Sequence, residues 1–278
     1  MTSSPKSPTY CSPPTSFVGR KWLFREIQMN LTQDLPTNGG VILHGAPGTG
    51  KTELMKALAG LGKQTWTDAN ANRSRSVNTS NSRADVLQSA ELCDLLNNLE
   101  IMSHINDLLY YSAPVPASGR DIASRVMACH FADVADESSC IVANFVHSVA
   151  KQIIRSRCAG LPYKELLRSR VDLARLLSTE CCSLDPARSF LEAVVQPLQQ
   201  LRNQGRLFEH RHYLVLVDGL CAGEMHKSDK THTLSSFLAE MAPRLPKWMK
   251  LIVTIRTSMR EVAFNLLPFS RIWSVQHD

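Results

Sequence analysis

The residues with the clearest chemical potential are eight consecutive positions near the start of the chain. They are Gly45, Ala46, Pro47, Gly48, Thr49, Gly50, Lys51 and Thr52. They fit the pattern G-x-x-x-x-G-K-[ST], in which glycines let the backbone curl so that several N–H groups face one anion. The lysine of such a loop reaches the β- and γ-phosphates, and the hydroxyl binds Mg²⁺. The pattern favours a phosphate-binding loop over a glycine-rich structural turn.

The segments on both sides of this loop have the character that the pattern requires. The apolar run Val41–Leu43 before it is typical of a buried parallel strand. Leu54 and Leu58 follow at helical spacing, which predicts a helix starting near Gly50. The loop is therefore expected to join a strand to a helix N-terminus, whose partial positive charge favours phosphate.

A second candidate is Asp218, at the end of the apolar run Tyr213–Val217. A carboxylate at the tip of a buried strand is costly unless it has a partner. A hydrated Mg²⁺ beside bound phosphates would be such a partner, which gives Asp218 the Walker B role. The alternative is an aspartate in a simple Asp-Gly turn.

Arg256 ends another apolar run, Leu251–Ile255. A charged residue at this strand tip would lie near the γ-phosphate and could sense it. The alternative is a surface arginine that caps the strand.

These runs belong to an alternation of strands and helices that predicts an α/β fold with a parallel sheet. Residues 1–16 are rich in serine and proline and are predicted to be a disordered tail, whereas residues 17–278 form the folded core. A polar, mobile insertion is expected at about 67–120. Further predicted elements are strands at Arg125–Phe131 and Arg271–Gln276, and helices around Leu23–Leu31, Val142–Ile153, Leu166–Leu177, Phe190–Leu201 (interrupted at Pro197) and Leu234–Met241.

Composition excludes several classes of function. Of the 278 residues 44% are hydrophobic and 20% charged, a globular balance. No apolar run reaches the roughly 20 residues that a transmembrane helix needs. The net charge of +6 is mild and aromatic residues make up only 6%, so nucleic-acid binding is not expected. The eight cysteines are scattered, which favours reduced thiols over a zinc site.

Several stretches together resemble a known family. The loop, Phe17–Arg20, Asp218–Leu220 and Ile252–Arg256 are similar to those of STAND-type P-loop NTPases, signalling ATPases related to the AAA+ group. Longer strings narrow the likeness to the NTPase domain of the TANC/rolling pebbles scaffold proteins. These strings are Phe17–Glu26, Phe145–Ala150, Asp218–Leu220, His226-Lys227, Thr233–Phe237 and Leu251–Arg256.

The resemblance implies a fold and a set of roles. It implies a three-layer sandwich of the ASCE type with strand order 5-1-4-3-2, ATP or ADP with Mg²⁺ as ligands, Val18 and Arg20 on the adenine side, and Arg256 as the sensor. Thr52 and Asp218 would hold the metal. Such proteins are cytoplasmic scaffolds, with the postsynaptic density as one location, and bind protein partners through ankyrin and tetratricopeptide repeats. Nucleotide-dependent self-association is one way in which such a module would act.

One departure from the family concerns hydrolysis. The fourth position after the Walker B aspartate often carries an acid that polarises the attacking water, and here it is Ala222. We therefore expect a nucleotide-binding switch with weak or no hydrolysis. An alternative is an active Mg²⁺-dependent ATPase in which Glu224 positions water. A further alternative is a scaffold module that does not bind nucleotide.

Overall fold

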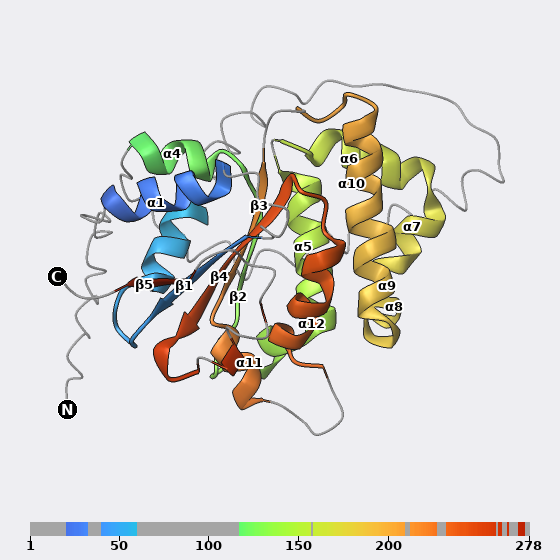
Figure 1. Ribbon diagram of the computed structural model, residues 1–278. Coiled ribbons are helices and arrows are strands. Elements are labelled where there is room, and N and C mark those ends of the chain that lie inside the picture. The colour runs from blue at the N-terminus through green and yellow to red at the C-terminus, as the bar shows by residue number, and fades with distance from the viewer. Residues whose placement is uncertain are drawn as a thin grey trace, which may run out of the picture.

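The computed structural model of the chain describes residues 21–32, 40–59, 117–156, 158–208, 212–226, 232–259, 261–262, 266 and 272–275. The strands of these residues are β1 (Gly40–Gly45), β2 (Val126–Phe131), β3 (Tyr213–Asp218), β4 (Met249–Arg256) and β5 (Ile272–Val275). They form one parallel sheet in the order β2-β3-β4-β1-β5 (Figure 1). The expected order 1-4-3-2 is thus confirmed, and the short β5 pairs along the other side of β1.

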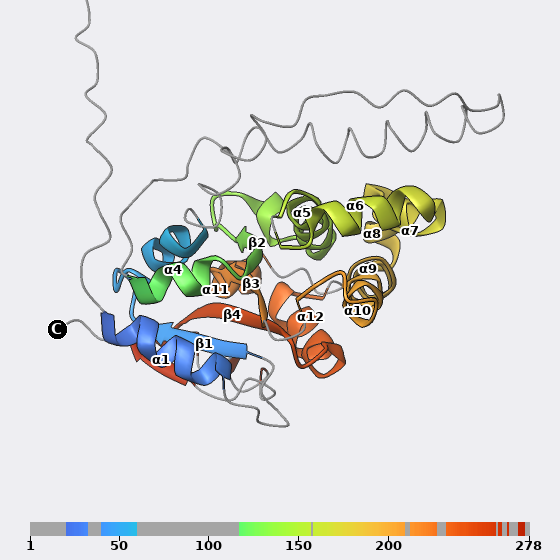
Figure 2. The same ribbon diagram turned by 90° about the horizontal axis from the view of Figure 1, so that it is seen from above.

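Helices cover both faces of this sheet (Figure 1). On or near the first face lie α1 (Lys21–Thr32), the helix over residues 51–59 and α4 (Ala117–Ala123). On or near the second lie α5 (Val142–Arg155), α6 (Gly160–Ser169), α7 (Val171–Leu176), α8 (Thr179–Leu184), α9 (Pro186–Phe190), α10 (Gln196–Asn203) and α12 (Leu234–Met241). Helix α11 (Leu220–Met225) follows β3 directly, and Figure 2 shows α6 to α10 grouped beside α5 and α12.

The two faces have separate hydrophobic cores because side chains alternate along each strand. On β3, Leu214 and Leu216 pack with α1 and the helix over 51–59. Val215 and Val217 of the same strand pack with α5 and α12 on the other face. All four are fully buried, which is why the strand is apolar at every position rather than at every second one.

The helices predicted from apolar spacing are largely confirmed. Helices α1, α5 and α12 bury the residues that predicted them. The helix expected at Leu166–Leu177 is instead two helices, α6 and α7. The backbone of Arg170 leaves the helical region between them, with φ −127° and ψ 81°. Its guanidinium binds Asp172 at 2.7 and 3.0 Å from the two carboxylate oxygens.

The interruption expected at Pro197 lies further back along the chain. Residues Leu191–Val195 form a π-helical turn that joins α9 to α10 without a break, and Gln196 N–H donates to Leu191 C=O. Pro197 has no N–H to give to Ala193 C=O four residues earlier. The buried hydroxyl of Tyr163 on α6 donates to that carbonyl instead, at 2.5 Å. A side chain from another helix therefore supplies the donor that proline lacks.

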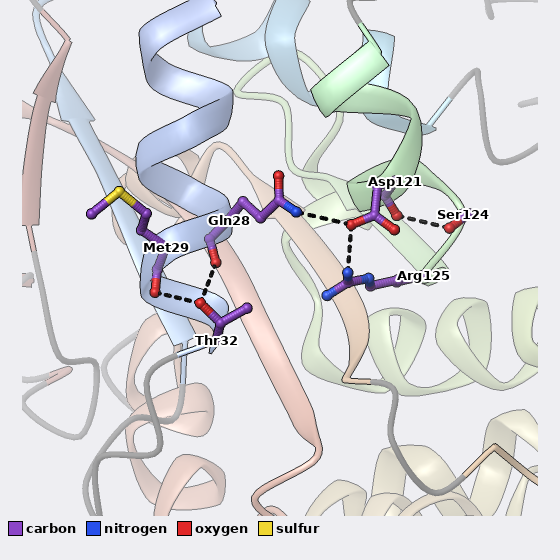
Figure 3. Close-up of polar contacts among 6 residues, drawn as sticks. All are labelled: Gln28, Met29, Thr32, Asp121, Ser124 and Arg125. Atoms are coloured by element: carbon purple, nitrogen blue, oxygen red, sulfur yellow. Dashed lines mark hydrogen bonds and ion pairs between the residues drawn. The ribbon is translucent and has the colours of Figure 1, made fainter.

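Helix α1 is held to α4 by a polar contact (Figure 3). One carboxylate oxygen of Asp121 accepts hydrogen bonds from Gln28 Nε2, at 3.2 Å, and from Arg125 Nη2. Arg125 directly precedes β2, so the contact ties α1 to the start of a sheet strand.

The predicted boundaries are only partly covered. Residues 1–16 and 67–116 lie outside the described residues. Residues 117–120, which we assigned to the insertion, form the start of α4. None of the described helices has the length and apolar character needed to cross a lipid bilayer.

The Tyr163 hydrogen bond generates a stability prediction. Tyr163→Phe should lower the free energy of unfolding by roughly 1–3 kcal/mol, because it leaves the buried Ala193 carbonyl without this donor. In a Pro197→Ala background the loss should be smaller, since residue 197 then has an N–H to offer. Urea unfolding of the four proteins measures the coupling. Equal losses in both backgrounds would contradict this account of the π-helical turn.

Candidate functional site

The carboxyl ends of three strands meet at one edge of the sheet. The register pairs Gly45 of β1 with Arg256 of β4, and Val217 of β3 with Val253 of β4. Asp218 therefore lies beside Thr254, one position further along the two strands. In open α/β sheets ligands bind outside this edge. The candidate residues from three distant stretches of sequence are thus brought to one place.

The loop after β1 is curled in the way that its glycines allow. Gly48 and Gly50 have φ of +78° and +77°, a region that other residues rarely adopt. The Thr49 hydroxyl donates to Ala46 C=O at 2.9 Å, which closes the turn. The helix begins at Lys51, with Leu54 N–H donating to Gly50 C=O at 3.0 Å. The loop therefore leads directly into a helix N-terminus, where backbone N–H groups are available to an anion.

The ammonium group of Lys51 lies over the loop that precedes it. Its Nζ donates to Gly45 C=O at 2.9 Å and to Ala46 C=O at 2.8 Å, and lies 3.2 Å from Thr49 Oγ1. The side chain is half-buried. The lysine charge is therefore held at the loop rather than extended into solvent.

Asp218 is the buried acid of the site, with a relative exposure of 5%. Burial raises the pKa of its carboxyl group, and hydrogen bonds from Thr254 and Thr52 and the charge of Lys51 oppose that rise in pKa. The Thr254 hydroxyl donates to Asp218 Oδ1 at 2.5 Å. The structure thus brings Lys51, Thr52 and Asp218 together.

Thr254 is a site residue that the sequence analysis missed. It lies inside an apolar strand, two positions before the charged tip that drew attention to Arg256. A signal for it exists: Thr254 shares the face of β4 that is opposite to Val253, as Asp218 shares the face of β3 opposite to Val217. Recognising that the two polar residues are neighbours requires the strand order, which alternation within one strand does not contain.

Gly219 fixes the backbone that follows Asp218. Its φ is +75°, and a Cβ at this position would lie 2.2 Å from the backbone oxygen of Ala132, just after β2. Ala132 N–H in turn donates to Asp218 C=O at 3.0 Å. Only glycine fits here without a shift of the backbone. The exits of β2 and β3 are therefore locked against each other.

Arg256 lies at the exposed tip of β4, beside the start of the loop. Its backbone N–H donates to Cys221 Sγ at 3.1 Å. Burial raises the pKa of the Cys221 thiol, and the positive charges of Arg256 and Lys51 oppose that rise. Both cations therefore act on one thiol, which puts the Arg256 charge at the same edge as the loop lysine.

The two residues that bear on hydrolysis are both on α11. Ala222 is buried, and its side chain packs in the core that α12 shares. The Glu224 carboxylate accepts a hydrogen bond from the buried Ser235 hydroxyl of α12. Glu224 is thus engaged with α12, and its role as a water-positioning residue stays a prediction. Val18 and Arg20, expected on the adenine side, lie outside the described residues.

No protein-family model matches the chain, and no solved structure matches it significantly. The described residues form an α/β domain whose parallel sheet has the order 1-4-3-2, consistent with a P-loop-like core. The function must therefore be argued from the site itself.

The burial of Asp218 generates a prediction about pH and stability. Because its pKa is raised in the folded protein, the ionised carboxyl disfavours folding above that pKa, and this penalty disappears as the pH falls towards the ordinary value for aspartate. Asp218→Asn should therefore raise the free energy of unfolding near neutral pH by roughly 1 kcal/mol, a usual size for a stabilising change. The gain should shrink as the pH is lowered.

Urea unfolding between about pH 7 and about pH 4, without Mg²⁺ or nucleotide, measures this difference. The matched control is Asp172→Asn, since Arg170 lowers the pKa of Asp172 and its removal should bring no gain. A variant at position 218 that is less stable than wild type at neutral pH would refute the prediction.

Proposed function

We propose that this chain is a P-loop NTPase module of the STAND type that binds ATP or ADP with Mg²⁺ and acts as a conformational or assembly switch in a signalling scaffold. The observation that carries the proposal is the meeting of Lys51, Thr52 and Asp218 at the carboxyl edge of the sheet. The strand order agrees with that of P-loop folds. The similarity to TANC/rolling pebbles proteins supports the scaffold role, the cytoplasmic location and the expected protein partners.

The proposed phosphate contacts use groups that the loop already presents. Backbone N–H groups at the start of the helix would bind phosphate oxygens, and Lys51 would neutralise part of their charge. Lys51 now donates to carbonyl groups of its own loop, and phosphate oxygens would compete for the same ammonium hydrogens. Arg256, at the neighbouring strand tip, is proposed to sense the γ-phosphate.

The donor atoms at the site fit Mg²⁺. Thr52 and Asp218 offer a hydroxyl and a carboxylate oxygen, the hard donors that Mg²⁺ prefers, and few protein ligands suffice because the nucleotide phosphates and water complete its shell. Thr52 would bind the ion and Asp218 would support it. When bound, Mg²⁺ neutralises phosphate charge.

Weak or absent hydrolysis is part of the proposal. General-base assistance contributes roughly 10²- to 10⁴-fold to rates. Ala222 has no carboxylate to give, and the Glu224 carboxylate is held by Ser235. Binding would therefore outlast the nucleotide chemistry, as a switch requires.

Nucleotide binding is tested by titration with a fluorescent ATP analogue. Wild type should bind in an Mg²⁺-dependent manner, and Lys51→Ala should bind at least about 10-fold more weakly, because a charge-assisted hydrogen bond is worth roughly 1.5–3 kcal/mol. Lys247→Ala, an exposed lysine at the opposite end of β4, is the matched control and should bind like wild type. Absence of Mg²⁺-dependent binding, or unchanged binding by Lys51→Ala, would overturn the proposal.

Hydrolysis is tested separately by single-turnover measurements on wild type and Glu224→Gln. Both should turn over ATP at rates near the uncatalysed background and within about 2-fold of each other, since neither has a general base to lose. A wild-type rate far above background that falls on Glu224→Gln would instead support the active ATPase.

A further inference from the structure

The Thr254 hydroxyl occupies both of its principal hydrogen-bonding roles at the tips of β3 and β4. It accepts a hydrogen bond from Gly219 N–H at 2.9 Å and donates to Asp218 Oδ1 at 2.5 Å. The residue is 2% exposed, so water does not compete for these bonds. The chain Gly219 N–H to Thr254 to Asp218 thus closes within two adjacent residues of β3 and one residue of β4.

The direction of this chain decides what it does. A hydroxyl has a single hydrogen to donate, and the Gly219 N–H can only donate. The Thr254 oxygen must therefore accept from Gly219, and its hydrogen is left for the carboxylate. Since φ of Gly219 is fixed by the contact with Ala132, the donor that sets the hydroxyl orientation is itself rigid. Asp218 is oriented by backbone geometry acting through one side chain.

We infer that Thr254 is a positioning residue that orients the Asp218 carboxylate for Mg²⁺-dependent nucleotide binding. The inference rests on the proposed function, because it assigns to Thr254 a part in that same site. Thr254 does not touch the phosphate loop in this role. It acts through Asp218, as partners that hold a metal-binding group in place do in other metal sites.

A merely structural role for Thr254 predicts a different result. If its hydroxyl only satisfies buried polar groups, its removal weakens the whole domain, and nucleotide binding changes equally with and without Mg²⁺. If it positions Asp218, the loss is confined to the gain in affinity that Mg²⁺ provides, because the loop and Lys51 bind phosphate without Asp218. The Mg²⁺-dependent part of the affinity therefore separates the two roles.

The experiment is a titration of full-length chains with a fluorescent ATP analogue, once with Mg²⁺ and once with EDTA. Thr254→Val keeps the size of the side chain and removes the hydroxyl, whereas Thr254→Ser keeps the hydroxyl. The gain in affinity due to Mg²⁺ should fall about 10-fold or more in Thr254→Val, as expected for loss of a group that supports a metal ligand. The EDTA affinity should stay within about 2-fold of wild type, and Thr254→Ser should keep most of the Mg²⁺ gain.

Thr32→Val on α1 is the matched control, since it also removes a hydroxyl with two hydrogen bonds, to Gln28 C=O and Met29 C=O (Figure 3). It should leave both affinities unchanged. Thr254→Val with an unchanged Mg²⁺ gain, or with equal losses under both conditions, overturns the role of Thr254 alone. A wild type that binds no nucleotide overturns the proposed function, and the role of Thr254 falls with it.

Discussion

Strand β4 is paired on both sides, with β1 and with β3, and this double pairing sets the geometry of the whole site. Backbone hydrogen bonds on each side fix its register against both neighbours. One register puts Arg256 beside the first residue of the phosphate loop, and the other puts Thr254 beside Asp218. A slip of a single residue would turn every side chain of β4 to the opposite face. The two hydrophobic cores forbid such a slip, because Leu251 and Val253 belong to one core and Ile252 to the other.

The same constraint explains why the acid of the site can be buried at all. Asp218 has lost most of its water, and the site returns polar partners from three directions: Thr254 from β4, Thr52 from the loop helix, and the charge of Lys51. Even so, burial prevails and its pKa is raised. A residue held at such a cost against stability is usually retained for function, and functional sites are where folds carry this kind of strain.

Sequence patterns reached the site residues that stand at strand ends. The loop and Asp218 could be found because their residue types break an apolar run at its end. Thr254 breaks such a run from within, and its meaning depends on a neighbour 36 residues away along the chain. The order 1-4-3-2 came from family resemblance, since local periodicity does not say which strands pair. The π-helical turn was misplaced for a similar reason, because it depends on Tyr163, a partner on another helix.

The buried position of Ala222 bears on how this chain can change in evolution. Its side chain lies in the core that α11 shares with α12, among residues such as Leu234 and Phe237. An acid substituted there would enter an apolar environment, where an unpaired carboxylate costs several kcal/mol. A descendant could therefore not acquire an acid at this position by one mutation while keeping α11 in place. It would need a compensating polar partner or a displaced helix at the same time, so the absence of the acid acts as a ratchet.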